Sequence, residues 1–358
     1  MFKKISAFMI ALSLAAVGMT GCGSEKSESA SQKNATQASI ETQKENNAAN
    51  PKDNSNGSFS VVCTIFPEYD WVKEILGKHT ENAEITYLLD NGVDLHSYQP
   101  TAEDMMKIST CDLFIYVGGE SDEWVEDALD DADNKNMKVI ALMDVLGDSA
   151  KAEELKEGMQ ADEEEHDHEE NESEDHEEEI EYDEHVWLSL KNAKVFCTEI
   201  EKNLEAIDSA NAADYKANLA GYTKELDKLD SSFKKAFDES KQKTLVFGDR
   251  FPFRYFVEDY GLDYYAAFIG CSAETEASFE TISFLSDKVK ELDCKTIYTL
   301  ENSDKSIAET IISTSGKDVD IAELNSLQSV SKDDIKDGAS YISLMQKNYN
   351  VLKEALAK

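Results

Sequence analysis

The chain has 358 residues and carries 74 acidic side chains against 35 basic ones, a formal net charge of −39 at pH 7. A charge of this size and sign argues against nucleic acid as a partner, because phosphates would be repelled, and makes cations the natural ligands. Once the N-terminal segments are set aside, roughly 300 residues remain, enough for two domains or lobes.

The N-terminus predicts an exported protein with a lipid anchor. Two lysines precede a short apolar run that ends at Gly21-Cys22, which supplies the charged, apolar and small-residue parts of a secretory signal. Because a cysteine closes the run, residues 1–21 resemble a bacterial lipoprotein signal, whose cleavage leaves Cys22 as an acylated N-terminus. An uncleaved membrane anchor or an ordinary signal peptide is the alternative, although the run is short for a membrane span. Under each interpretation we expect the body of the protein outside the cytoplasm.

Residues 22–57 are predicted to form a flexible tether. They consist largely of Ser, Asn, Gln, Lys, Glu and Ala, with almost no apolar side chains. Such a segment cannot bury enough surface to offset the entropy of ordering. The rest of the chain therefore reaches the membrane only through Cys22.

Short apolar runs alternate with segments of helical periodicity along the rest of the chain. This alternation predicts βαβ units and mainly parallel sheets. The expected fold class is α/β, with two lobes, each a mainly parallel sheet flanked by helices, over residues 58–207 and 242–358. The expected strands are 61–66, 85–89, 113–117 and 139–143 in the first lobe, and 245–247, 264–268, 296–300 and 319–322 in the second, before a closing helix at 337–356.

A long connecting helix is predicted at 208–241. Apolar side chains recur at helical spacing from residue 190 to 240, with a polar break at 208–211, so a shorter helix precedes the long one. Ligands of open α/β sheets bind beyond the carboxyl ends of the strands, and those of two-lobed proteins bind between the lobes. We therefore expect the ligand site beyond the carboxyl ends of the strands, in the cleft between the two lobes.

An acidic insert at 151–183 interrupts the pattern inside the first lobe. It is nearly all Glu and Asp, with His166, His168 and His176 among them. An acidic run alone indicates a solvated, mobile loop. Imidazoles and carboxylates together form weak, adaptable sites for zinc-like ions, so this loop is predicted to gather metal.

His96 and His185 are the candidate ligands in the folded body, because each follows a strand-like or loop segment and has polar neighbours. Either histidine alone would be unremarkable. Five cysteines remain if Cys22 is lipidated, without the C-x-x-C spacing of a zinc ribbon or redox pair. We interpret them as buried free thiols, and a disulfide cannot be deduced. They are Cys63, Cys111, Cys197, Cys271 and Cys294.

Three segments in order, 64–71, 96–104 and 183–193, resemble the cluster A-I metal-binding lipoproteins, the zinc or manganese receptors of bacterial ABC uptake systems. The resemblance extends from about residue 60 to the C-terminus. It implies that His96, in His-x-Tyr-x-Pro, is the first metal ligand and that His185 is the second. The acidic, histidine-containing loop lies just before the second histidine, the position at which the zinc receptors of this family have a similar loop.

The second lobe departs from the family pattern. By register the third ligand of the family falls on Arg250, which cannot bind a cation and could instead brace the cleft. The adjacent Asp249 is our predicted replacement. Glu276, Glu301 and Asn325 are weaker reserves.

The resemblance implies an extracytoplasmic solute-binding lipoprotein that captures a divalent transition metal and delivers it to an ABC importer permease. Zinc is favoured because the loop supplies imidazoles, and we expect a monomer. The alternatives are a manganese-specific receptor and a surface adhesin or interaction lipoprotein. A hydrolase that pairs His96 or His185 with Asp183 would need a catalytic motif that this sequence lacks, so we expect no enzyme.

Overall fold

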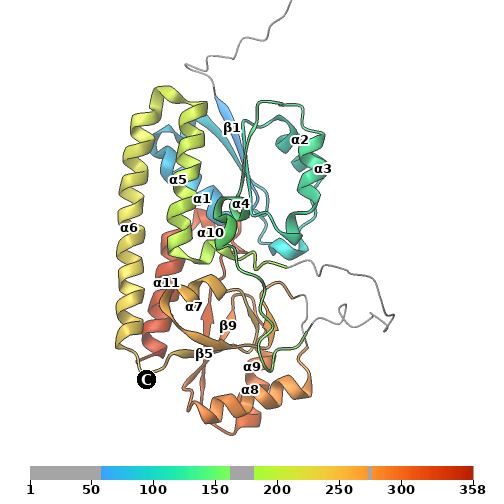
Figure 1. Cartoon of the computed structure of the whole chain (residues 1–358), viewed down its shortest axis with the longest axis vertical. Helices are drawn as coiled ribbons and strands as arrows, with labels where there is room; N and C mark the ends of the chain where they lie inside the picture. The colour runs from blue at the N-terminus through green and yellow to red at the C-terminus, as the bar shows by residue number, and fades with distance from the viewer. Residues whose placement is uncertain (1–57, 162–180, 273–275, 358) are drawn as a thin grey trace, which may run out of the picture. The chain divides into compact units, whose positions relative to one another are not determined.

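The computed structural model describes residues 58–161, 181–272 and 276–357, all of them within one compact unit (Figure 1). The expected signal and tether, Cys22, and the three histidines of the acidic loop lie outside the described residues. No helix among the described residues is long and apolar enough to cross a membrane.

The first lobe contains a four-stranded parallel sheet in the order β2-β1-β3-β4. The central strands β1 and β3 are almost wholly buried, as expected of parallel strands covered on both faces. The four expected strands are confirmed, with shifts of up to three residues at their ends. Their bounds are β1 Phe59–Cys63, β2 Ala83–Tyr87, β3 Leu113–Tyr116 and β4 Lys138–Ala141.

Helices cover this sheet, and their N-terminal caps shape the loops beside them. At the start of α2, the Thr101 hydroxyl accepts a hydrogen bond from the Asp104 amide, and the Asp104 carboxylate accepts one from the Thr101 amide. This reciprocal pair anchors the end of the loop that carries His96. The helices of this part are α1 Phe66–Leu76, α2 Ala102–Thr110, α3 Trp124–Asp130, α4 Leu142–Leu146 and α5 Leu190–Ile207.

The predicted connecting helix is α6, Ala212–Glu239, separated from α5 by a short turn at Ser209–Asn211 (Figure 1). It packs against α1 and α5 of the first lobe and against α7 and α11 of the second. Near its end, the Phe233 ring meets the Phe256 ring of α7 edge-on, with centroids 5.0 Å apart. One continuous helix thus contributes to the packing of both lobes.

The second lobe contains three parallel strand pairs: β5 with β7, β6 with β8, and β9 with β10. A parallel bridge between Phe247 and Tyr298 links the first pair to the third. The strand expected at 264–268 is two short strands, because its beginning pairs with β5 and its end with β6. The bounds are β5 Thr244–Val246, β6 Arg250–Phe251, β7 Asp263–Tyr265, β8 Phe268–Ile269, β9 Thr296–Leu300 and β10 Asp320–Leu324.

The closing helical region is also divided. The single helix expected at 337–356 begins only at Tyr341, after a turn in which Gly338 has a φ of +95° and Ser340 caps the new helix. The helices that follow α6 in the chain are α7 Arg254–Tyr260, α8 Phe279–Glu291, α9 Ser306–Ser315, α10 Lys332–Lys336 and α11 Tyr341–Ala355, and the start of α10 contacts Asp90 of the first lobe.

The described ends of the acidic insert differ from the solvated loop that the composition predicts. Gln160 donates a backbone hydrogen bond to Ala267 of the second lobe at 2.9 Å, and Glu154 forms an ion pair with Arg254. Ala152 also forms an antiparallel bridge with Tyr182. These partners lie far away in the sequence, so composition could not reveal that residues 151–161 pack on the second lobe.

Candidate metal centre

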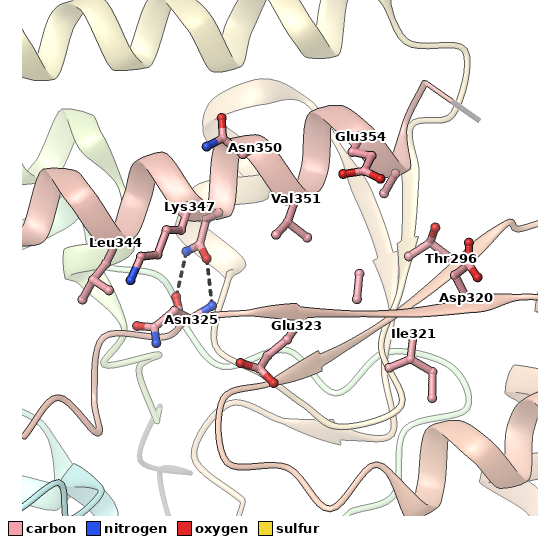
Figure 2. A pocket seen from close by; sticks show the side chains of 13 residues that line it. Thr296, Asp320, Ile321, Glu323, Asn325, Leu344, Lys347, Asn350, Val351 and Glu354 are labelled. Carbon is pink, nitrogen blue, oxygen red and sulfur yellow. Dashed lines mark hydrogen bonds between the residues drawn. The ribbon is translucent and has the colours of Figure 1, made fainter. Parts of the chain in front are cut away.

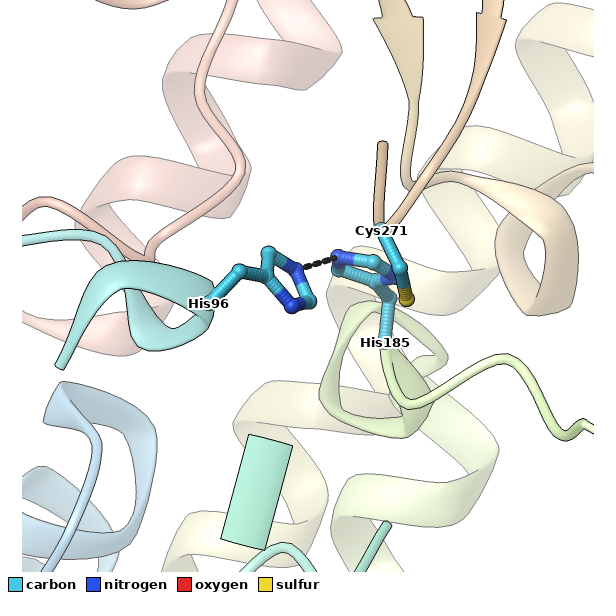
Figure 3. Close-up of side chains that lie close together, drawn as sticks. All are labelled: His96, His185 and Cys271. Carbon is cyan, nitrogen blue, oxygen red and sulfur yellow. Dashed lines mark hydrogen bonds between the residues drawn. The ribbon is translucent and has the colours of Figure 1, made fainter. Parts of the chain in front are cut away.

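The two histidines predicted as metal ligands lie in contact in the structure. The Nε2 atoms of His96 and His185 lie 3.2 Å apart. Among the described residues, these two and Cys271 form a cluster in which one ligand atom from each lies within 4.8 Å of the others. Figure 3 shows the three side chains arriving from separate segments of the chain.

His96 is held by its own loop and by a neighbouring one. It lies in the short 3₁₀ turn Leu95–Ser97, which Asp94 caps by accepting a hydrogen bond from the His96 amide at 3.1 Å. The His96 Nδ1 lies 2.8 Å from the Ser121 hydroxyl and 3.6 Å from the Glu184 carboxylate. These contacts on Nδ1 direct Nε2 toward His185.

His185 is wholly buried and is oriented by the residue two positions earlier. Asp183 accepts a hydrogen bond from the His185 amide at 2.8 Å, and the same carboxylate oxygen lies 3.1 Å from Nδ1. The Cε1 and Nδ1 atoms of the ring also lie against Gly270, where a Cβ atom would come within 2.8 Å of the imidazole. A glycine is therefore required at this close approach. A carboxylate on Nδ1 leaves Nε2 as the free lone pair.

Both rings are prepared to act as neutral ligands. Burial lowers the pKa of each imidazole, and the neighbouring His185 lowers that of His96 further. Two nitrogen ligands about 2.05 Å from a tetrahedral zinc ion would be roughly 3.3 Å apart, close to the observed separation. The pair therefore has both the protonation state and the spacing of two ligands to one cation.

Acidic groups surround the pair. Burial raises the pKa of Asp183 and of Glu153 to about 7. One carboxylate oxygen of Glu153 and one of Glu184 are buried without a hydrogen-bond partner among the described residues. Buried acceptors of this kind are costly unless positive charge lies nearby. A divalent cation at the histidine pair would reduce that cost.

Asp249, the predicted third ligand, lies outside the three-residue cluster. One carboxylate oxygen accepts a hydrogen bond from the Arg250 amide at 2.9 Å, and the other accepts one from the Leu300 amide at 3.1 Å. These contacts brace the start of β6 against the end of β9. The role of Asp249 as a ligand stays a prediction. Arg250 reaches across to the first lobe, where its Nη2 pairs with Asp94 at 2.9 Å.

Two of the three reserve ligands, Glu301 and Asn325, form hydrogen bonds with other residues. Both carboxylate oxygens of Glu301 accept hydrogen bonds from Ser326, at 2.6 and 2.7 Å. Glu276 is exposed to solvent. The Asn325 side chain accepts a hydrogen bond from the Leu327 amide at 2.9 Å.

Asn325 also lines a cavity of about 710 Å³ between β10 and α11 (Figure 2). Two hydrogen bonds of 2.8 Å join its backbone to the Asn348 side chain there. Neither candidate histidine lines this cavity. This cavity is therefore separate from the histidine pair.

Cys271 was missed as a site residue by sequence reasoning, which treated it as a buried free thiol. The five cysteines among the described residues are unbridged, and Cys271 alone of them lies beside the histidine pair. No spacing motif marks it, since its partners are 86 or more positions earlier. Its one sequence signal is its place directly after Gly270, in the loop that follows β8.

The fold and the facing imidazoles define a class: two-lobed α/β solute-binding proteins with a histidine-based metal centre. The family model for the periplasmic zinc-uptake complex component A, ZnuA, matches residues 61–355. The chain therefore belongs to the ZnuA family, which confirms the resemblance to the metal receptors of ABC uptake systems.

Individual relatives agree with this assignment. The zinc-binding lipoprotein AdcA of Streptococcus pneumoniae strain R6 is 32% identical over 301 residues, which cover 84% of this chain and 56% of AdcA. The high-affinity zinc uptake system protein ZnuA of Bacillus subtilis is 30% identical, with 85% of this chain and 89% of that protein covered. The chain spans about half the length of the AdcA relatives that it matches.

Solved structures show the same fold. The Zn(II)-bound ZnuA-like domain of S. pneumoniae AdcA is 29% identical and superposes with a TM-score of 0.64, covering 84% of this chain and all of that domain. TroA of Treponema pallidum, a periplasmic zinc-binding protein, is 22% identical with a TM-score of 0.67, over 84% of this chain and all of TroA. At that identity the likeness supports the fold alone.

Proposed function

We propose that this protein binds Zn²⁺ outside the cytoplasm, through His96 and His185, and delivers it to the permease of an ABC importer. The observation that carries the proposal is the pair of buried Nε2 atoms 3.2 Å apart, each on a ring whose Nδ1 is already engaged. The zinc named for AdcA and for the B. subtilis protein supports the choice of ion. The protein acts as a monomeric carrier and not as an enzyme.

The arrangement favours capture of a dehydrated ion. His185 is fully buried, and the His96 side chain is 10% exposed, so an ion between them exchanges bulk water for fixed nitrogen ligands. The Nδ1 contacts to Asp183 and Ser121 keep the rings aligned and increase their basicity as ligands. A bound divalent cation favours the carboxylate form of the acidic side chains Glu153 and Glu184 beside it, which then compensate its charge.

The direct test is zinc binding by the full chain. Replacing either ligand, by His96→Ala or His185→Ala, removes one of the two nitrogen donors and should weaken the tightest zinc equivalent by at least about 100-fold. His79→Ala is the matched control, because His79 pairs with Asp214 at 2.7 Å and lies outside the cluster. Competition against a zinc chelator measures the affinity. Unchanged tight binding in either ligand variant would overturn the proposal.

Attachment to the membrane through a lipid on Cys22 is the second part of the proposal. It rests on the N-terminal sequence, in which a short apolar run ends at this cysteine. Since one processed cysteine carries more than one acyl chain, Cys22→Ala should move the protein from the membrane fraction to the soluble fraction. A processed variant that stays with the membrane would show a different anchor.

A further inference from the structure

We infer that Cys271 is the ligand that the second lobe contributes, so that the ion is held by two imidazoles and one thiolate. The inference rests on the proposed function, because it concerns the same site. It assigns a donor to the lobe whose expected ligand position is occupied by Arg250, and it gives the site a preference among metals.

The first support is placement. Among the described residues, Cys271 is the one second-lobe residue in the cluster with His96 and His185. Tetrahedral zinc would hold a sulfur and a nitrogen roughly 3.6 Å apart. Because the ligand atoms already lie within 4.8 Å of one another, a closure of about 1 Å or less brings the thiol into bonding position.

The second support is the anchoring of the short loop on both sides of Cys271. The Gly270 amide donates to the Glu153 carboxylate at 3.0 Å, and the Arg250 guanidinium donates to the Ser272 carbonyl at 3.4 Å. Gly270 also lets the backbone lie directly against the His185 ring. These contacts on Gly270 and Ser272 hold the backbone of Cys271 in place, so that its thiol lies beside the two imidazoles.

The third support comes from the other second-lobe oxygens near the site. Both carboxylate oxygens of Asp249 accept backbone amides, and both of Glu301 accept hydrogen bonds from Ser326. Ligation by either carboxylate would have to use the remaining lone pair of an oxygen that already joins β6 to β9, or β9 to the segment after β10. Ligation by Cys271 leaves those contacts intact.

The chemistry of ligation fixes the metal preference. The S–H bond of Cys271 breaks, its proton passes to solvent, and the thiolate lone pair forms the metal–sulfur bond without any change of oxidation state. A thiolate with two imidazoles suits Zn²⁺ and other ions that accept soft ligands, whereas Mn²⁺ prefers oxygen donors. The site should therefore discriminate against manganese, and Cys271 should carry much of that discrimination.

Cobalt spectroscopy tests the sulfur bond directly, because a thiolate bound to Co²⁺ gives an intense charge-transfer absorption in the near ultraviolet. All samples carry Cys22→Ser, which removes a cysteine unrelated to the cluster. The full chain with one equivalent of Co²⁺ should show the band, and Cys271→Ser should lose it. Cys294→Ser is the matched control, since this buried cysteine of the same lobe lies outside the cluster and should retain the band.

Affinity measurements complete the test. Cys271→Ser should weaken Zn²⁺ binding by roughly 10- to 100-fold and Mn²⁺ binding much less, so the zinc-to-manganese ratio falls. Circular dichroism checks that the variant is folded. If it is not, Cys271→His supplies a third donor without sulfur and should bind zinc tightly without the charge-transfer band.

The outcomes separate the inference from the proposed function. A band that survives in Cys271→Ser or Cys271→His, or a wild-type complex with no band, overturns thiolate ligation. If His96→Ala still abolishes tight zinc binding in that case, the proposed function stands. A wild-type chain that binds no zinc at all overturns both.

Discussion

The two sides of the metal centre are built in different ways. On the first-lobe side, His96 and His185 each have one ring nitrogen engaged by a neighbouring residue and the other turned toward the site. On the second-lobe side, the carboxylates of Asp249 and Glu301 accept hydrogen bonds within their own lobe. The first lobe therefore presents a prepared pair of ligands, while the polar groups of the second lobe mainly hold its own loops together.

The second lobe also supports the first across the site. Arg250, at the position where the family pattern places a ligand, pairs with Asp94, the residue that caps the turn carrying His96. The indole of Trp187, two residues after His185, donates to the Ser326 carbonyl at 2.8 Å. An ion pair and a hydrogen bond thus connect the second lobe to both ligand-bearing loops. The second lobe thus positions the two first-lobe histidines, in addition to the one donor that we infer for it.

Among residues that support the ligands or lie apart from them, the largest effect on zinc affinity should come from a residue that supports a first-lobe ligand. Asp183→Asn replaces the carboxylate that orients His185 by a neutral amide and should weaken zinc binding by roughly 10- to 100-fold. Titration against a chelator measures the loss.

Asp70→Asn is the control for this change. Asp70 is similarly buried, its pKa is likewise raised to about 7 by burial, and it accepts a hydrogen bond from the Tyr341 amide away from the cluster. Its removal should leave zinc affinity unchanged. Equal losses in the two variants would mean that the effect at Asp183 is one of general stability and not of ligand orientation.

A smaller effect on binding should follow from changing a second-lobe carboxylate. Asp249→Ala leaves the amides of Arg250 and Leu300 without their acceptor, which should lower the free energy of unfolding by about 1–3 kcal/mol. Zinc affinity should change by less than about threefold, because the substitution removes hydrogen bonds within the second lobe and does not remove a metal ligand.

Urea unfolding and zinc titration of the same sample separate these two effects. Glu276→Ala, which removes an exposed carboxylate from the same lobe, should change neither quantity. An affinity loss in Asp249→Ala as large as that in His185→Ala would make Asp249 a ligand and would remove the contrast between the two sides.

The same contrast explains how much of the site the sequence could predict. His96 and His185 were predicted from the motifs that carry them, and the structure brings them together; their supporting residues Asp94 and Asp183 each lie two positions earlier in the chain. The parallel strands of the first lobe were equally clear, since buried strands form continuous apolar runs.

The second-lobe contribution was not predictable by these means. Cys271 lies beside the histidines because β8 pairs with β6 and because Gly270 packs on the His185 ring. Asp249 looked like a free carboxylate because its second acceptor contact, with the Leu300 amide, spans 51 positions. Both features depend on tertiary pairing, which composition and local periodicity do not encode.

The smallest effect on the tight site should come from the acidic loop. We expect deletion of residues 162–180 to leave one tight zinc equivalent and to remove the weak ones, since His166, His168 and His176 are lost while His96, His185 and Cys271 remain. The deletion keeps residues 151–161, which contact the second lobe through Gln160 and Glu154. Calorimetric titration of both forms gives the number and strength of the sites.

A full-length variant with only the three loop histidines changed to alanine separates imidazole from carboxylate binding. Because the weak sites use both kinds of ligand, this variant should lose most of the weak binding and retain the tight equivalent. Loss of the tight equivalent in either form would mean that a loop histidine reaches the centre as a ligand. The cobalt charge-transfer band of the wild-type chain then decides whether that histidine binds beside Cys271 or in its place.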